Sequence, residues 1–156
     1  MEMLHQPSWG WGLSLIALTI ALHATAVVMM SFMAIRIRTR LENRRHPLWK
    51  LIAVLICMIA VVGLLLAVLH AIECTIWAAA YWWLGAVDSF LHALLYSVDS
   101  MSTRGTSGLT LQTHWKMRGA LEAVDGMLLF GVSAAYIFAV MQAYWAMLAA
   151  HVPKRR

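Results

Sequence analysis

Residues 88–108 read DSFLHALLYSVDSMSTRGTSG, and this segment decides which kind of fold the chain forms. Asp88-Ser89 is a helix N-cap signal, so we predict a short helix of about three turns over Phe90–Met101. Small and glycine-bearing residues follow, from Ser102 to Gly108. An apolar helix followed by such a stretch is typical of a re-entrant loop, whose irregular backbone must be buried by protein or line a water-filled path. The segment therefore favours a pore or cavity.

A second interpretation of Phe90–Met101 is an amphipathic helix that lies on the outer leaflet of a membrane. Such a helix normally carries Lys or Arg on its polar face. None occurs between Glu73 and Met101, so we favour the re-entrant loop while the interfacial helix stays open.

The segments on either side of it indicate a membrane protein. Hydrophobic residues make up 62% of the 156 residues and charged residues 12%, against about 45–50% and 25% in soluble domains. Asp, Glu, Lys and Arg are absent from Met3–Ile35, Leu51–Ile72 and Gly126–Pro153. Each of these runs reaches the ~20 residues that cross a bilayer. We predict three crossings and exclude a soluble enzyme, a disordered linker and a disulfide-rich scaffold.

The basic residues predict the orientation of the chain. Six of them lie between Arg36 and Lys50 against the single acid Glu42, and the chain ends Lys154-Arg155-Arg156. Short basic segments stay in the cytoplasm. We therefore expect the N-terminus outside and the C-terminus in the cytoplasm, in the plasma membrane, which in a bacterium is the inner membrane. Topology or anionic lipid explains the basic loop, so no nucleic-acid partner is expected.

The stretch Tyr96–Gly108 places a Ser-Thr-x-Gly core at residues 102–105, and Trp115 and Arg118 follow. This pattern resembles the pore module of tetrameric potassium channels, many of which read aromatic-Ser-x-x-Thr-x-Thr-Thr-Val-Gly-Tyr-Gly-Asp, with a Trp and an Arg before the inner helix. The resemblance covers about Leu48 to Leu148. It implies an all-α membrane protein with three transmembrane helices, and a re-entrant pore helix and filter-like loop between the second and third. It also implies a homotetramer.

The resemblance divides the chain into three parts. Residues 1–47 form an extra N-terminal transmembrane helix and a basic cytoplasmic loop, residues 48–150 a potassium-channel-like pore module, and residues 151–156 a short basic cytoplasmic tail. The filter-like loop comprises Ser102, Thr103, Arg104, Gly105, Thr106, Ser107 and Gly108.

Four positions of this loop depart from the family: Arg104 stands in place of the usual Val, Thr106 in place of the aromatic residue, Ser107 in place of the second glycine and Gly108 in place of the acid. With Ser at the second glycine position, a complete ladder of filter carbonyls is not expected. The resemblance thus implies a pore-forming subunit that conducts monovalent cations without strict potassium selectivity. Two alternatives are a non-conducting protein that acts as an assembly or regulatory partner, and an anion pore lined by Arg104.

Asp99 is the expected partner of Arg104. In the family, the side chain at the Val position points away from the pore axis toward the pore helix. Arg104 would then reach Asp99 and form a bidentate ion pair that supports the loop. The alternative is that both side chains are hydrated in an outer vestibule.

The last crossing carries small residues at regular spacing. Gly126 and Gly131 resemble the glycines at which an inner helix bends. Gly131, Ala135 and Ala139 recur every four residues, which lets helices approach closely; the alternative is a stripe that faces lipid. Glu122 and Asp125 are expected near the outer end of this helix, as snorkelling or capping residues.

His23 lies near the middle of the first crossing, whereas His70 lies within a turn of the predicted outer end of the second. This difference in depth argues against a haem between them and favours hydrogen-bonded packing histidines. We find no motif for catalysis or for a metal or cofactor site, so no enzyme is expected. The expected partners are the lipid bilayer, other copies of the chain and an inorganic ion, with a permeant monovalent ion in place of a cofactor.

Overall fold

A computed structural model describes residues 8–42, 47–105, 108, 111 and 115–149. Within these residues all of the regular secondary structure is helical, and there is no strand. The helices are α1 (Ser8–Glu42), α2 (Leu48–Trp83), α3 (Phe90–Met101) and α4 (Lys116–Ala149). Three of them, α1, α2 and α4, are long and apolar enough to cross a membrane. The all-α fold, the three candidate crossings and the bounds predicted for the short helix are confirmed.

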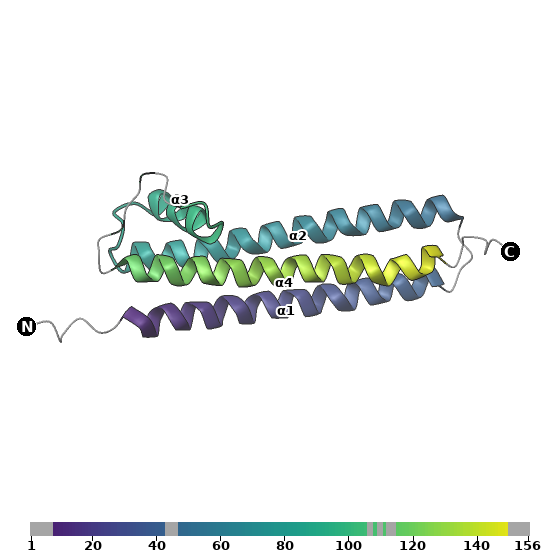
Figure 1. Ribbon diagram of the computed structural model, residues 1–156, viewed down its shortest axis with the longest axis horizontal. Helices are drawn as coiled ribbons and strands as arrows, with labels where there is room; N and C mark the ends of the chain where they lie inside the picture. The colour runs from purple at the N-terminus through teal and green to yellow at the C-terminus, as the bar shows by residue number, and fades with distance from the viewer. Residues whose placement is uncertain (1–7, 43–46, 106–107, 109–110, 112–114, 150–156) are drawn as a thin grey trace, which may run out of the picture.

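The three long helices lie alongside one another, with α4 between α1 and α2, and α3 packs at one end of the bundle (Figure 1). The start of α1 and the end of α4 lie at opposite ends, as an odd number of crossings requires. At a rise of ~1.5 Å per residue, the 36 residues of α2 extend about 54 Å. This exceeds the ~30 Å hydrocarbon core of a bilayer, so the helices are long enough to project beyond it.

The second helix is longer than its charge-free stretch predicted. We expected the crossing to end near Ile72 and residues 73–118 to form the outer connection, but α2 continues to Trp83. Glu73 does not end the helix because its carboxyl group is fully buried and faces two histidines. A charged residue that has partners inside the bundle can stay in the middle of a crossing.

The end of α2 is a Schellman motif built on Gly85. Gly85 has a φ of 72°, which a residue without a Cβ adopts at little cost. The N–H of Gly85 donates to the carbonyl of Trp82 at 3.1 Å, and the N–H of Ala86 donates to the carbonyl of Tyr81 at 2.9 Å. These two bonds satisfy carbonyls at the helix end and turn the chain back toward α3.

The C-terminal end of α3 reaches far along both of its neighbours. The sulfur atoms of Met101 and Cys74 are 3.4 Å apart, and Cys74 lies nine residues before the end of α2, or about 14 Å. On the other side, a Cβ at Gly126 would collide with the carbonyl oxygen of Met101. Gly126 lies ten residues beyond Lys116, about 15 Å along α4. The C-terminal end of α3 therefore packs against both α2 and α4, about 14–15 Å from their ends.

This close approach predicts different effects for Gly126 and Gly131, two of the glycines of α4. Gly126→Ala forces the end of α3 away from α4. We therefore expect the free energy of unfolding, measured in detergent, to fall by about 1–3 kcal/mol. A Cβ at Gly131 meets nothing within 4 Å, so Gly131→Ala is expected to be neutral or to stabilise by up to ~1 kcal/mol. Equal effects of the two changes would show that α3 does not contact Gly126.

Candidate functional site

The bundle interior holds an unusual set of polar side chains. Glu73, Glu122 and Asp125 are each fully buried, and buried polar groups are stable only where they have hydrogen-bond partners. We call the buried polar set, together with His70, the polar core: Thr19, His23, His70, Glu73, Ser97, Asp99, Ser100, Arg118, Glu122, Asp125 and Ser133. Its members come from all four helices.

Glu122 joins α4 to α2 and α3. Its Oε2 accepts a hydrogen bond from the hydroxyl of Tyr81 at 2.9 Å, and its Oε1 accepts one from Ser97. Ser97 lies 2.9 Å from the carbonyl oxygen of Cys74 as well. One carboxyl group thus fixes the position of α3 against both of its neighbours.

Asp125 joins α4 to α1 and α2. Its Oδ2 accepts from the Thr19 hydroxyl at 2.6 Å and from the indole N–H of Trp77 at 3.0 Å. The expectation that Glu122 and Asp125 snorkel or cap near the helix end is therefore wrong. Because α4 begins at Lys116, Glu122 and Asp125 lie about 1.7 and 2.5 turns inside it. Both side chains are fully buried in the bundle.

Glu73 faces two histidines. Its Oε1 is 2.9 Å from Nδ1 of His23, and its Oε2 is 2.9 Å from Nδ1 of His70. On the far side of both rings, the Oγ of Ser133 lies 3.2 Å from Nε2 of His23 and 3.1 Å from Nε2 of His70. One ligand atom from each of His23, His70 and Glu73 lies within 4.8 Å of the other two, so these residues could hold a metal ion.

The predicted difference in depth between the histidines is also wrong. Their ring centroids are 5.3 Å apart, because α2 runs on to Trp83 and places His70 well inside the bundle. The sequence does contain a signal of this polar core. His70-x-x-Glu73 and Glu122-x-x-Asp125 are two pairs of ionisable residues at i,i+3 in otherwise apolar helices. An ionisable residue within a crossing is a functional candidate by default.

The filter-like loop begins with a strained turn. Thr103 has a φ of 56°, which is unusual for a β-branched residue. Its N–H donates to the carbonyl of Ser100 at 2.9 Å, and the N–H of Arg104 donates to the carbonyl of Asp99 at 3.0 Å. Gly105 and Gly108 also have positive φ, of 83° and 86°. The predicted loop residues Thr106 and Ser107 lie outside the described part of the chain.

This turn brings Arg104 back to Asp99. The Nη1 of Arg104 is 3.5 Å from Oδ1 of Asp99, and the side chains are 73% and 10% exposed, respectively. An ion pair therefore links the two side chains. In the isolated chain the carboxylate is buried and the guanidinium is at the surface.

The small residues of α4 have two different environments. Gly126 is buried against the end of α3, whereas Gly131, Ala135 and Ala139 are exposed in the isolated chain. This stripe is open to lipid or to a second copy of the protein. Near the start of α4, the buried guanidinium of Arg118 lies 3.9 Å above the centre of the Trp115 ring.

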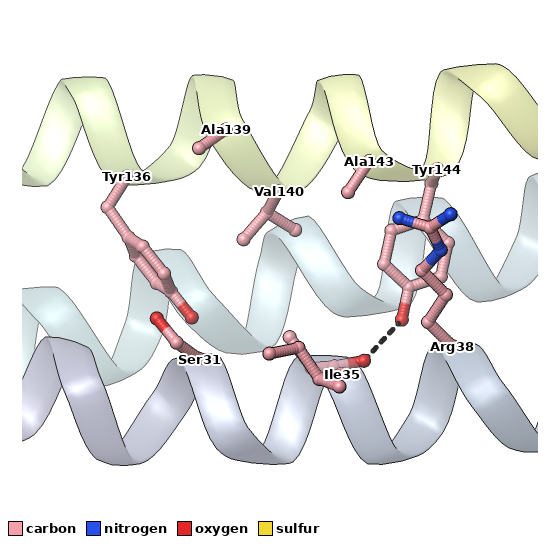
Figure 2. A pocket seen from close by; sticks show the side chains of 9 residues that line it. Ser31, Ile35, Arg38, Tyr136, Ala139, Val140, Ala143 and Tyr144 are labelled. Atoms are coloured by element: carbon pink, nitrogen blue, oxygen red, sulfur yellow. Dashed lines mark hydrogen bonds between the residues drawn. The ribbon is translucent and has the colours of Figure 1, made fainter.

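A cleft of about 190 Å³ separates α1 from α4 toward the other end of the bundle. Figure 2 shows Tyr136 and Tyr144 of α4 pointing toward α1, with the Tyr144 hydroxyl donating to the carbonyl of Ala34 at 3.3 Å. Arg38 lies beside Tyr144 and pairs with Glu42 at 2.7 Å. The cleft is mostly apolar and holds none of the polar core.

Comparisons with protein-family models, with curated proteins and with solved structures found no match to this chain. Its functional assignment therefore rests on its own residues and their geometry.

The contacts of Glu122 predict the effect of removing one hydroxyl. Tyr81→Phe takes a donor from a buried carboxyl group, so we expect the free energy of unfolding to fall by about 1.5–3 kcal/mol. Tyr136→Phe is the matched control, because its hydroxyl faces the cleft beside Ser31 and meets no carboxyl group. Denaturant unfolding in detergent measures both. A control that loses as much stability as Tyr81→Phe would contradict the role given to Glu122.

Proposed function

We propose that this chain is the subunit of a homotetrameric pore for monovalent cations, in which residues 48–150 form the pore module and α3 is a re-entrant pore helix. The observation that carries the proposal is the position of Met101, which contacts Cys74 and Gly126 about 14–15 Å from the ends of α2 and α4. Because α2 is about 54 Å long and the hydrocarbon core is ~30 Å thick, about 12 Å projects on each side of a centred helix, which brings Met101 to the edge of the core or inside it. A helix that lay across the ends of the long helices could not reach Gly126.

The backbone after α3 supports assembly into an oligomer. Residues 102–105 are irregular and exposed in the isolated chain. At membrane depth such backbone is tolerated only when protein covers it or water lines it. In an oligomer, neighbouring copies would cover part of this backbone, and the rest would line a central water path. The exposed stripe of Gly131, Ala135 and Ala139 offers a face for close helix contact with such a copy.

The charges near the loop favour a cation over an anion. Four uncompensated guanidinium groups about 5 Å from an ion would each repel a cation by about 3 kcal/mol at an effective dielectric constant near 20. Here Asp99 lies 3.5 Å from Arg104 and offsets that charge. The C-terminal end of α3 adds a partial negative charge at the same place. An anion pore lined by Arg104 would need its charge to be uncompensated.

The orientation follows from the basic residues. We place the N-terminus outside and the C-terminus in the cytoplasm of the plasma membrane, because Arg36, Arg38 and Arg40 lie at the end of α1 opposite to α3. In this orientation the loop after α3 opens toward the outside, as in the pore module that the sequence resembles.

The proposal predicts four chains per particle and cation flux. Native mass measurement in nanodiscs is expected to give a tetramer, and liposomes that contain it are expected to pass both K⁺ and Na⁺. Gly105→Ala should reduce the flux, because Gly105 has a φ of 83° that Ala resists. Gly10→Ala, in open space on α1, is the matched control.

Three results would overturn this assignment. A monomer would remove the pore, and a tetramer without ion flux would leave the non-conducting assembly or regulatory partner as the better interpretation. Flux of chloride in place of K⁺ and Na⁺ would favour the anion pore.

Asp99 and Arg104 give a second test, through a double-mutant cycle on melting. In the isolated chain Arg104 is 73% exposed, and the coupling of an exposed pair is about 0.2–1 kcal/mol. Burial of the loop between copies should make the loss of either partner cost about 3–5 kcal/mol in the tetramer. We therefore expect the double change Asp99→Val with Arg104→Val to be milder than Asp99→Asn alone. Simple additivity in the tetramer would mean that the pair does not form there.

A further inference from the structure

The two histidines beside Glu73 cannot both be satisfied as neutral rings. Ser133 Oγ lies within hydrogen-bond distance of Nε2 of both His23 and His70. A hydroxyl group has one proton, so it can donate to only one of the two rings and must accept from the other. At least one neutral ring therefore donates through Nε2 and turns the lone pair of its Nδ1 toward the carboxylate of Glu73.

The geometry identifies His70 as a ring in that state. Its Nδ1 is 2.9 Å from Oε2 of Glu73. Both atoms are buried, yet within the described part of the chain neither makes an aligned hydrogen bond. Two lone pairs at this distance repel each other unless a metal ion or a proton lies between them. Nδ1 of His70 and Oε2 of Glu73 can therefore face each other only around a shared metal ion or a shared proton.

The spacing of the atoms suits a metal ion. Two ligand atoms that are each about 2.0–2.1 Å from one ion, at 90–110° to each other, lie ~2.9–3.4 Å apart. Oε1 of Glu73 is 2.9 Å from Nδ1 of His23, and Oε2 is 2.9 Å from Nδ1 of His70, so each nitrogen has one carboxylate oxygen at the short end of this range. The hydroxyl of Ser133 is placed to accept from the Nε2 atoms, as the partners of metal-binding histidines normally do.

The charge of Glu73 points in the same direction. Glu73 is fully buried among apolar helices, where an unpaired carboxylate is costly. A divalent cation bound to its carboxyl group would offset that charge.

We propose that His23, His70 and Glu73 bind one divalent first-row transition metal ion, for which Zn²⁺ is the natural probe. Two imidazole nitrogens and a carboxylate suit Zn²⁺ and its neighbours in the series, whereas Mg²⁺ and Ca²⁺ prefer oxygen ligands. The ion joins α1 to α2 near the middle of the charge-free stretch of α1. The site does not depend on the proposed pore and exists whether or not the chain conducts.

Metal content tests the proposal on the full-length protein, purified with a tag that contains no histidine. We expect wild-type protein to hold one equivalent of Zn²⁺ after equilibration, measured by inductively coupled plasma mass spectrometry. His70→Gln and Glu73→Gln should lower the bound Zn²⁺ at least tenfold. His92→Gln is the matched control, because His92 is exposed on α3 and lies outside the cluster; it should keep the wild-type content.

A second variant covers the case in which loss of a ligand prevents folding. Ser133→Ala keeps all three ligands and removes only the hydroxyl that orients the two rings, so we expect Zn²⁺ affinity to fall about 10–100-fold. Zn²⁺ should raise the melting temperature of wild-type and His92→Gln protein, and more Zn²⁺ should be needed for the same rise in Ser133→Ala.

Two outcomes would overturn the metal site. One is wild-type protein that neither retains Zn²⁺ nor melts at a higher temperature in its presence. The other is equal Zn²⁺ content in wild-type and His70→Gln protein.

Discussion

Buried carboxyl groups hold the four helices in one arrangement. Helices in lipid gain no hydrophobic driving force by associating, so close packing and polar contacts determine how they assemble. Glu122 takes its donors from α2 and α3, and Asp125 takes its donors from α1 and α2. Each carboxyl group is fully buried, and leaving a buried charge without its partner costs about 3–5 kcal/mol. The hydrogen bonds to Glu122 and Asp125 therefore fix the positions of α1 and α3 relative to α2 and α4.

The parts of the fold that were predictable from the sequence depend on local properties. Charge-free runs long enough to cross a bilayer identified α1, α2 and α4, and a cap signal before an apolar segment identified α3. The helix ends and the polar core were not predictable, because counting charges assumes that charged residues leave the membrane. Glu73 breaks that assumption, since it has partners that are distant in sequence. Its contact with His23 joins residues 50 positions apart, and no pattern in a single sequence reports such a pair.

The loop after α3 was also predictable from the sequence only in part. The residues 102–108 were identified from a resemblance, and the approach of Arg104 to Asp99 follows from the helical turn between them. The left-handed conformation of Thr103 could not be foreseen, because a β-branched residue avoids a φ of 56° and such strain typically costs about 1–3 kcal/mol. The two hydrogen bonds from the N–H groups of Thr103 and Arg104 hold the turn against that cost. Strain of this kind gathers at functional sites, and here it occurs where the proposed filter begins.

The polar core also restricts how α4 can move. The resemblance implies that an inner helix bends at its glycines, yet Gly126 is packed against the backbone of Met101 and has no free space. Gly131 has free space, and a bend there would displace the part of α4 that begins with Ser133. Because Ser133 contacts both His23 and His70, such a bend would pull its hydroxyl away from the two rings. The histidine cluster and the shape of α4 are therefore coupled, and whatever cation the cluster holds would favour the straight helix.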